Sequence, residues 1–260
     1  MAGPYYFQGV TLLITHYNRS ASLERLLAAF RKLNCRFDDI VVSDDCSKPE
    51  QLEKIKSLHA DYSFRLLTTP KNGGLGNNLN KGQDAVNTPY TLYIQEDFVP
   101  LDSFPEKLQD ALQFMEDRKD LDMVRFYSYV KYPYLRPAKK GFSEMVFKIW
   151  YPGYMKFYMY SDHPHLRRST FLQKFGHYRE GVKSDYTEYC MMLSFLKHKG
   201  KALYYDDFKG LLDQVNSDAE PSTVKRASWS KSKNPLISVV RHAYRYLKLN
   251  YNYLRGLENR

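Results

Sequence analysis

The sequence predicts an α/β fold with a mainly parallel sheet flanked by helices. Short runs of apolar and β-branched residues alternate with segments of helical periodicity through residues 10–95. Polar clusters follow each of the first four predicted strands, at the edge where parallel sheets bind ligands. The 260 residues, of which 43% are hydrophobic, are enough to bury one large core, so one main domain is expected.

Four strands and three helices are expected in the first part of the chain. The strand signals cover residues 10–15, 39–43, 64–68 and 90–94. Apolar residues at helical spacing predict a helix over residues 20–30 with Ser20 as its N-cap, and Pro49 is typical of the first turn of a second helix. A loop rich in glycine and asparagine then leads into a third helix around residues 79–86.

The second part of the chain is rich in aromatic residues. A helix is expected over residues 104–115, a strand over 122–127, and a loop followed by a helix over 180–199. Between Phe126 and Tyr160, 13 of 35 residues are aromatic, against 15% in the whole chain. This density has two interpretations, a packed and partly exposed mixed sheet or a platform whose aromatic faces hold an acceptor sugar.

Composition limits the compartment and the redox state. No segment approaches the ~20 consecutive apolar residues of a membrane span, and the N-terminus lacks a secretory signal pattern, which predicts a cytoplasmic protein. Cys35, Cys46 and Cys190 are too scattered for a disulfide framework or a zinc site, so they are expected to be reduced.

Residues 1–9 end in Tyr-Phe-Gln-Gly, which resembles a protease site, and are expected to be a tag or a disordered leader. Residues 10–221 then form the main domain, and residues 222–260 form a basic helical tail.

The net charge of +10 is concentrated in this tail. Residues 222–260 hold nine Lys or Arg and one Glu, a charge of +8, which leaves +2 for the rest of the chain. A domain that binds nucleic acid usually spreads its charge over a folded face, so no nucleic-acid partner is expected. Asn234 and Pro235 predict the start of a helix.

The predicted C-terminal helix is amphipathic. Its apolar stripe consists of Leu236, Val240, Ala243, Leu247, Tyr251 and Leu254. The basic residues, which lie largely off this stripe, are Arg241, Arg245, Lys248 and Arg255. This pattern predicts peripheral attachment to an anionic membrane surface on the cytoplasmic face, and the alternative is a helix that packs back on the domain with its charges solvated.

The four polar clusters after the strands carry the candidate site. They are His16 to Arg19, Asp44-Asp45, Asn72 to Gly76, and Gln95 to Asp97. A carboxylate after the second strand can accept a hydrogen bond from a base imide and others from ribose, which is the hypothesis for Asp44 and Asp45, with a helix cap as the alternative. Tyr17 suits stacking on a base. Glycines in the third cluster allow close approach to a ligand or a plain turn.

These motifs resemble those of family 2 glycosyltransferases with the GT-A fold, over roughly residues 10–205. The first-strand signature is matched by Ile14-Thr15-His16-Tyr17-Asn18-Arg19, and the second-strand acidic motif by Val42-Ser43-Asp44-Asp45-Cys46-Ser47. The glycine-asparagine segment is matched by Asn72-Gly73-Gly74-Leu75 with Asn80-Lys81-Gly82. The metal-binding Asp-x-Asp and the late acidic motif correspond to Gln95-Glu96-Asp97 and Ser184-Asp185-Tyr186-Thr187-Glu188.

The resemblance implies an inverting, metal-dependent hexosyltransferase. It would move a sugar from a nucleotide-sugar, with UDP as the expected nucleotide, to a hydroxyl of a glycan or lipid-linked acceptor in surface polysaccharide synthesis. Asp97 is the implied ligand of Mn or Mg, which neutralises the departing diphosphate. Asp185 is the implied general base, with Glu188 second. The implied nucleotide-binding residues are Thr15, Tyr17, Arg19, Asp44, Asp45, Asn72, Gly73, Lys81, Gln95 and Glu96.

Departures from the family pattern define the alternative functions. Gln95 replaces the first acid of the metal motif, Leu79 stands where an arginine is usual, and Tyr186 falls where the catalytic Asp would fall. These departures motivate a catalytically silent relative that binds nucleotide or glycan as an assembly partner. A nucleotidyltransferase is disfavoured, because Arg19 alone is a thin phosphate-binding signature. His163 and His165 flank a proline and are interpreted as a surface loop, with metal ligation as the alternative.

Overall fold

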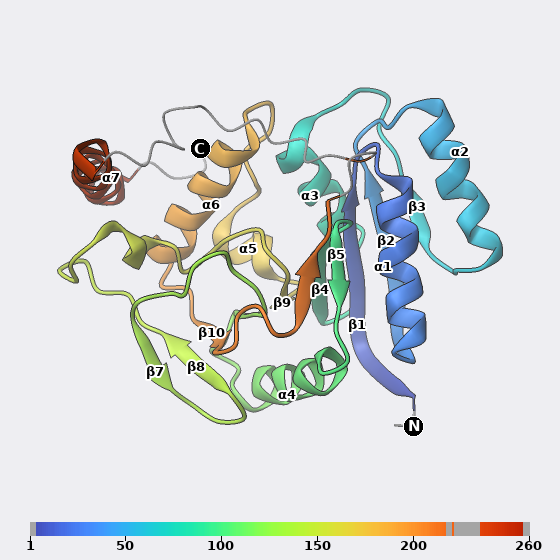
Figure 1. Ribbon diagram of the computed structural model, residues 1–260, viewed down its shortest axis with the longest axis horizontal. Helices are drawn as coiled ribbons and strands as arrows, with labels where there is room; N and C mark the ends of the chain where they lie inside the picture. The colour runs from blue at the N-terminus through green and yellow to red at the C-terminus, as the bar shows by residue number, and fades with distance from the viewer. Residues whose placement is uncertain (1–3, 217–219, 221–234, 257–260) are drawn as a thin grey trace.

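A nine-stranded sheet with helices on both faces forms the body of the part of the chain that the structure describes (Figure 1). The structure is a computed structural model and describes residues 4–216, 220 and 235–256. Within these residues, no helix is both long and apolar enough to cross a membrane.

Strands and helices alternate in the first half of the chain as predicted. They are β1 (Tyr5–His16), α1 (Ser20–Lys32), β2 (Cys35–Asp44), α2 (Pro49–Ser57), the 3-10 helix η1 (Leu58–Ala60), β3 (Arg65–Leu67), α3 (Gly74–Asp84) and β4 (Tyr90–Gln95). Next come β5 (Phe98–Pro100), α4 (Phe104–Asp117), β6 (Met123–Arg125), β7 (Leu135–Pro137), β8 (Phe142–Met145), the 3-10 helix η2 (Tyr154–Phe157) and β9 (His165–Arg168). The last elements are α5 (Phe171–Phe175), α6 (Ser184–Lys197), β10 (Ala202–Tyr205), β11 (Leu212–Gln214) and α7 (Pro235–Arg255).

The sheet has the order β3-β2-β1-β4-β9-β6-β10-β8-β7, and β11 pairs separately with β5. β1 runs parallel to β2 and β4, and β2 runs parallel to β3, which confirms the predicted parallel sheet. β9 is antiparallel to both of its neighbours, β4 and β6. The N-terminal end of β9 therefore lies at the C-terminal edge of those strands, so the chain before β9 reaches the predicted ligand edge.

Alternate residues of β1 pack into two cores on opposite faces of the sheet. Leu12 and Ile14 belong to the core that α1, α2 and α4 cover, whereas Leu13 belongs to the core that α3, α5 and α6 cover. All three side chains are fully buried. Both faces of the sheet are therefore apolar, as expected for parallel strands with helices on each side, and the polar groups are left to the strand ends.

Two N-terminal expectations are corrected. A disordered leader is wrong for residues 5–9, which belong to β1, since residues 5–7 pair with residues 35–37 of β2; residues 1–3 lie outside the described part of the chain. Ser20 is the first residue of α1 and makes no capping hydrogen bond; its hydroxyl donates to Gln51 instead. The amides of Ala21 and Ser22 donate to the carboxylate of Glu220, at 3.0 and 2.9 Å, so a distant acid stabilises the start of α1.

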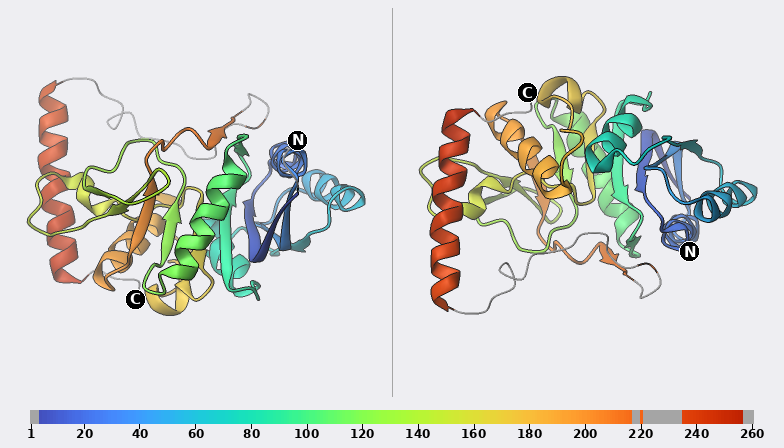
Figure 2. Two further views of the ribbon diagram at one scale, coloured as in Figure 1. Left: turned by 90° about the horizontal axis from the view of Figure 1, so that it is seen from below. Right: turned by 90° about the horizontal axis from the view of Figure 1, so that it is seen from above.

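α7 packs on the domain through one face. It begins at Pro235 as predicted, while Asn234 and the tail before it lie outside the described residues. Leu249 is buried against the domain, and the fully buried Lys156 donates to Asn250 Oδ1 at 3.1 Å and to the carbonyl of Tyr151 at 2.8 Å. Figure 2 shows α7 along the end of the molecule opposite β2 and β3. The helix is thus anchored by a buried cation as well as by apolar contact.

The predicted apolar stripe of α7 faces away from the domain. Val240, Leu247, Tyr251 and Leu254 are between 57% and 72% exposed, and Ala243 is also exposed. The side chain of the sixth stripe residue, at position 236, lies outside the described part. The helix packs on the domain, as the alternative proposed, but with a different face, so the stripe stays open to solvent.

Candidate active site

The C-terminal ends of β1, β2 and β4 lie side by side and form a polar rim. In the sheet register, Thr15 pairs with Ser43 on one side and with Gln95 on the other. The clusters that follow these strands therefore meet at one edge, as the sequence predicts for a parallel sheet. We call this edge, with residues 15–19, 44–45, 72–74, 81 and 95–97, the donor rim.

Asp44 is fully buried and fixes the loop after β1. Its carboxylate accepts hydrogen bonds from His16 Nδ1 at 2.7 Å and from the amide of Ser47 at 2.9 Å. The amide of Arg19 donates a hydrogen bond to Nε2 of His16 at 3.1 Å, so the imidazole links Asp44 to the start of α1. Burial alone would raise the pKa of Asp44, but the hydrogen bonds from His16 and Ser47 outweigh it and lower the pKa.

Asp45 ties the end of β2 to the start of α3. Its two carboxylate oxygens accept hydrogen bonds from the amides of Gly73 at 2.7 Å and Gly74 at 2.9 Å. Asn72 Nδ2 donates to the carbonyl of Asp45 at 3.2 Å. Burial raises the pKa of Asp45 in spite of these bonds. Lys81 donates to the carbonyl of Asp44 and adds one cation to this side of the rim.

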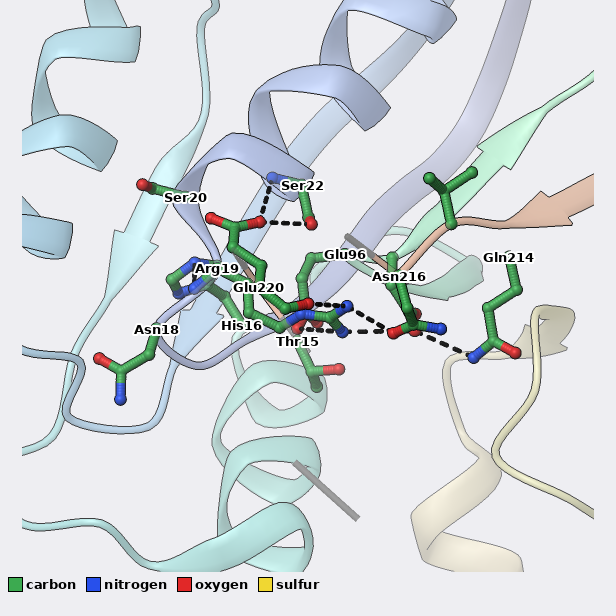
Figure 3. A network of polar contacts seen from close by, with 12 residues as sticks. Thr15, His16, Asn18, Arg19, Ser20, Ser22, Glu96, Gln214, Asn216 and Glu220 are labelled. Atoms are coloured by element: carbon green, nitrogen blue, oxygen red, sulfur yellow. Dashed lines mark hydrogen bonds and ion pairs between the residues drawn. The ribbon is translucent and has the colours of Figure 1, made fainter. Parts of the chain in front are cut away.

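Arg19 lies at the centre of a charged network (Figure 3). Its guanidinium is almost wholly buried, with Nη1 at 3.4 Å from Glu96 Oε1 and 3.3 Å from Asp97 Oδ2. Its Nη2 donates to Asn216 Oδ1 at 2.7 Å and to the carbonyl of Glu220 at 3.1 Å. Residues from near the C-terminal end of the main domain thus contact the motif that follows β1.

Asp97 fits the role of one metal ligand. Its Oδ2 accepts a hydrogen bond from Gln214 at 2.9 Å, whereas its Oδ1 is buried and has no hydrogen-bond partner among the described residues. An unpaired carboxylate oxygen is the donor type that Mg and Mn prefer. In the described part of the chain, no cluster of three His, Cys, Asp or Glu side chains is arranged to hold a metal ion. A cation at Asp97 would therefore take most of its ligands from phosphate oxygens and water, which is common for Mg.

The remaining rim residues differ in accessibility. Glu96 is only 8% exposed, and burial raises its pKa to about 7 against the opposing effects of His16 and Arg19. Thr15 Oγ1 lies 3.1 Å from the hydroxyl of Tyr93. Tyr17 is half-buried, and its side chain makes no hydrogen bond or ring contact with other described residues. Glu96 is thus enclosed by protein, while the Tyr17 ring is open for contact.

A second group of carboxylates lies at the same edge. The amide of Asp162, just before β9, lies 3.4 Å from Glu188 Oε1 on α6. Burial, followed by the neighbouring Asp162, raises the pKa of Glu188 well above its usual value, which disfavours the ionised form of this carboxyl group. Burial and then the charge of Asp162 raise the pKa of Tyr93, which places the pair beside the contact between Tyr93 and Thr15.

Arg125 positions this second group, and Asp185 lies on the same helix as Glu188. Buried Arg125 donates to the carbonyls of Tyr158 and Met159, at 2.8 and 3.2 Å, and to Ser161 Oγ at 2.6 Å, so it fixes the chain that leads to β9. Asp185 is exposed on the first turn of α6. The N-cap of α6 is residue 183, so Asp185 does not cap this helix.

Comparison with known proteins identifies the family. The sequence profile described as glycosyl transferase family 2 matches residues 11–180, which is more than half of the chain. The chain belongs to glycosyl transferase family 2. A comparison with curated protein sequences finds no match.

Solved structures similar to this glycosyltransferase-family chain share its GT-A fold. S. aureus TarS 1-349 in complex with UDP-GlcNAc gives a TM-score of 0.60 at 16% identity, over 96% of this chain and 73% of that chain. The mannosyltransferase PcManGT from Pyrobaculum calidifontis, in complex with GDP-Man and Mn²⁺, gives a TM-score of 0.55 at 14% identity, over 92% of this chain and 63% of that chain. This chain covers 59% of TarS 1-349 in the first matching structure of that protein.

The sequence motifs locate most, but not all, of the polar groups in this family 2 site. The structure gathers the predicted rim residues at one edge and puts Asp185 and Glu188 on α6. Sequence reasoning placed His16 in the first polar cluster but gave it no role, and it missed five residues that complete the networks: Asp162, Arg125, Gln214, Asn216 and Glu220. Asp162 could have been found from the sequence, because it directly precedes the two histidines that were considered as metal ligands. The interpretation of these histidines as a surface loop is wrong for His165, which is fully buried and donates to the carbonyl of His163 at 2.7 Å.

Proposed function

We propose that this family 2 member is an inverting hexosyltransferase that uses a nucleotide-sugar, with UDP as the nucleotide. The acceptor is a hydroxyl of a glycan or lipid-linked acceptor, and the biological role is surface polysaccharide synthesis. The observation that carries the proposal is the donor rim itself, where Arg19, Glu96 and Asp97 meet within 3.4 Å beyond the ends of β1 and β4. The relatives in complex with UDP-GlcNAc and GDP-Man support a nucleotide-sugar as the donor class.

Each side of the rim suits one part of the donor. The half-buried, uncontacted ring of Tyr17 suits stacking on the base. Asp44 and Asp45 shape the loops that the base and ribose would contact, since their carboxylates already accept hydrogen bonds from within the protein. Lys81 is the cation nearest to this side and is assigned to the diphosphate. Gln95 and Asn72 are accessible amides suited to the ribose and phosphate oxygens.

We assign the metal to Asp97 and the base to Asp185. A divalent cation at Asp97, Mn or Mg, would neutralise the charge of the departing nucleoside diphosphate. The base must be ionised when it removes the proton of the acceptor hydroxyl. The raised pKa of Glu188 disfavours its ionised form, which favours the exposed carboxylate of Asp185 one turn earlier.

We also propose that α7 attaches the enzyme to the cytoplasmic face of an anionic membrane. The stripe of Val240, Ala243, Leu247, Tyr251 and Leu254 is an apolar face that is exposed to solvent. The basic residues of the tail add electrostatic attraction of up to about 1 kcal/mol each near anionic lipid. A lipid-linked acceptor would then be presented to the enzyme at the membrane surface.

A screen of UDP- and GDP-sugars by thermal unfolding, with and without Mn²⁺, tests the donor assignment. A ligand present at 100 times its Kd adds about 2.7 kcal/mol of stability, which raises the Tm of a chain of this size by roughly 5–10 °C. UDP-sugars with Mn²⁺ are expected to give this shift, and free monosaccharides are the matched control.

Chromatographic detection of released UDP then distinguishes an active transferase from a catalytically silent relative that only binds the donor. An active transferase releases UDP slowly even to water, while a silent relative binds the donor without release. Binding without any release of UDP, across all sugars that shift the Tm, would overturn the catalytic assignment. Absence of any Tm shift would overturn the donor assignment.

A further inference from the structure

A cavity lined by cations lies between α7 and the domain. Its volume is about 210 Å³, which accommodates several water molecules and therefore a phosphate group. Three basic and three aromatic residues surround it: Arg241, Arg245, Lys248, Tyr158, Tyr189 and Tyr244. We call this cavity the α7 pocket. The domain contributes two of the tyrosines, and α7 contributes the remaining four residues.

Two of the cations that line the α7 pocket, Arg245 and Lys248, face aromatic rings. Arg245 Nη1 donates to the hydroxyl of Tyr154 at 3.4 Å, and its guanidinium lies 5.5 Å from the centre of that ring. Lys248 Nζ lies 5.8 Å from the ring centres of Tyr189 and Tyr244. Among the described residues, no carboxylate forms an ion pair with Arg245 or Lys248. Two cations that face aromatic rings and a cavity form a site for an anion.

The α7 pocket adjoins the carboxylate group at the candidate active site. Tyr189 of α6 lines the pocket, and Asp185 lies four residues earlier on the same helix, which places it one turn away on the same face. Glu188 directly precedes Tyr189. Arg125 fixes the chain at Tyr158, which also lines the pocket, through the Tyr158 carbonyl. A molecule with an anionic group in the pocket would therefore lie beside the part of α6 that carries Asp185 and Glu188.

We propose that the α7 pocket binds a phosphate group of the acceptor and so orients the acceptor hydroxyl toward the carboxylates of α6. This inference rests on the proposed function for the identity of the acceptor, and it narrows the acceptor class to phosphate-bearing glycans or lipid-linked phosphates. Arg245 recognises phosphate oxygens through its planar guanidinium, and Lys248 supplies a second positive charge. The anchored position of α7 on Lys156 and Leu249 keeps the pocket formed before the acceptor arrives.

The test measures binding of glycerol 3-phosphate by titration calorimetry, with the full chain and with UDP and Mn²⁺ present to occupy the donor rim. Arg245→Gln/Lys248→Gln removes two charges from the pocket, while Arg36→Gln/Arg255→Gln removes two charges from exposed positions outside it. The pocket variant is expected to bind at least tenfold more weakly, and the control variant is expected to bind like the wild type. Lys248→Glu, a change at an exposed side chain that leaves the core intact, is expected to weaken binding to a similar degree.

Equal affinity of all four proteins for glycerol 3-phosphate would refute the inference. Sedimentation with phosphatidylglycerol vesicles separates an acceptor phosphate from a lipid headgroup. Equal vesicle binding by the pocket and control variants supports the acceptor site. If only the pocket variant loses vesicle binding, and its affinity for glycerol 3-phosphate is unchanged, the inference is overturned in favour of headgroup binding. Because calorimetry needs no sugar transfer, a lack of turnover with every nucleotide-sugar would refute the proposed function while leaving this result intact.

Discussion

Glu96→Gln is expected to remove a pH-dependent destabilisation that the wild-type protein carries at its donor rim. Glu96 is 8% exposed, and burial raises its pKa from 4.5 to about 7. The folded protein therefore binds a proton at Glu96 that the unfolded chain has already lost between these two pH values. Stability from this group is fully present below pH 4.5 and is lost as the pH rises through 7.

The pKa difference sets the size of the effect. At about 1.4 kcal/mol per pKa unit, the full loss is about 3 kcal/mol. Between pH 5.5 and pH 8.5 the wild type should lose about 2 kcal/mol of this amount. Glutamine mimics the protonated carboxyl and does not titrate, so the variant lacks this loss. The variant should therefore gain on the wild type by about 2 kcal/mol across this range.

Urea unfolding followed by circular dichroism, at pH 5.5, 7.0 and 8.5, measures the difference. Other groups titrate in both proteins, so the free energy of unfolding of the variant minus that of the wild type isolates position 96. Glu53→Gln, at an exposed position on α2, controls for the introduction of a glutamine. A difference between Glu96→Gln and wild type that stays constant from pH 5.5 to 8.5 would show that Glu96 ionises normally in the rim.

Three further predictions concern the proposed chemistry and attachment. Asp97→Asn should abolish Mn²⁺-dependent transfer while the far-ultraviolet circular dichroism stays unchanged, because the orphaned carboxylate oxygen loses its charge. Asp185→Asn should reduce the rate of transfer about 100-fold to 10,000-fold, the usual cost of losing a general base, with donor affinity preserved and with a smaller loss in Glu188→Gln. Val240→Ser/Leu247→Ser should reduce sedimentation with anionic vesicles without lowering the Tm, because both side chains are exposed.

Each of these predictions has a contrary outcome. Full transfer activity of the wild type in the presence of a chelator would contradict the metal assignment. A large loss in Glu188→Gln with little effect of Asp185→Asn would move the base to Glu188. Equal vesicle binding by wild type and the serine variant would contradict attachment through the stripe. Point variants are preferred to removal of α7, since truncation would also leave Lys156 without its partner Asn250.

The local signals of the first half were enough to predict its architecture. The alternation of strands and helices predicted parallel pairing of β1 to β4, and the polar residues at their ends predicted the rim. The position of β9 was not predictable from local patterns. Its residues read His-Leu-Arg-Arg, yet they form a buried antiparallel strand, because its backbone pairs with β4 and β6 and Arg167 Nε donates to Gln83 at 2.9 Å.

The site could be located by motif but not resolved in detail. The motifs singled out Asp44, although the partner that shares its hydrogen bond, His16, emerges only from the loop geometry. Glu220 lies about two hundred residues from Ser22 in sequence, so no periodicity connects them. The raised pKa of Glu188 likewise depends on a neighbour, Asp162, that the fold alone brings close. Hydrogen bonds and ion pairs between residues far apart in the sequence are therefore the part of this site that only the three-dimensional structure reveals.

The insertion of β9 between β4 and β6 has a consequence for the order in which the protein folds. β1 to β4 meet through crossovers of a few tens of residues, so they can pair early with a modest loss of chain entropy. β6 and β10 pair with each other but join that sheet only through β9, which lies between β4 and β6. β9 follows β6 in the chain, so β6 cannot join the sheet until β9 has been synthesised. During synthesis the N-terminal half can thus assemble first, with the open edge of β4 waiting for a strand made later. In the folded protein β4 pairs with β1 on one side and with β9 on the other. Until β9 is made, the edge of β4 that β9 later covers is unpaired, so it is the segment that a chaperone would most need to bind.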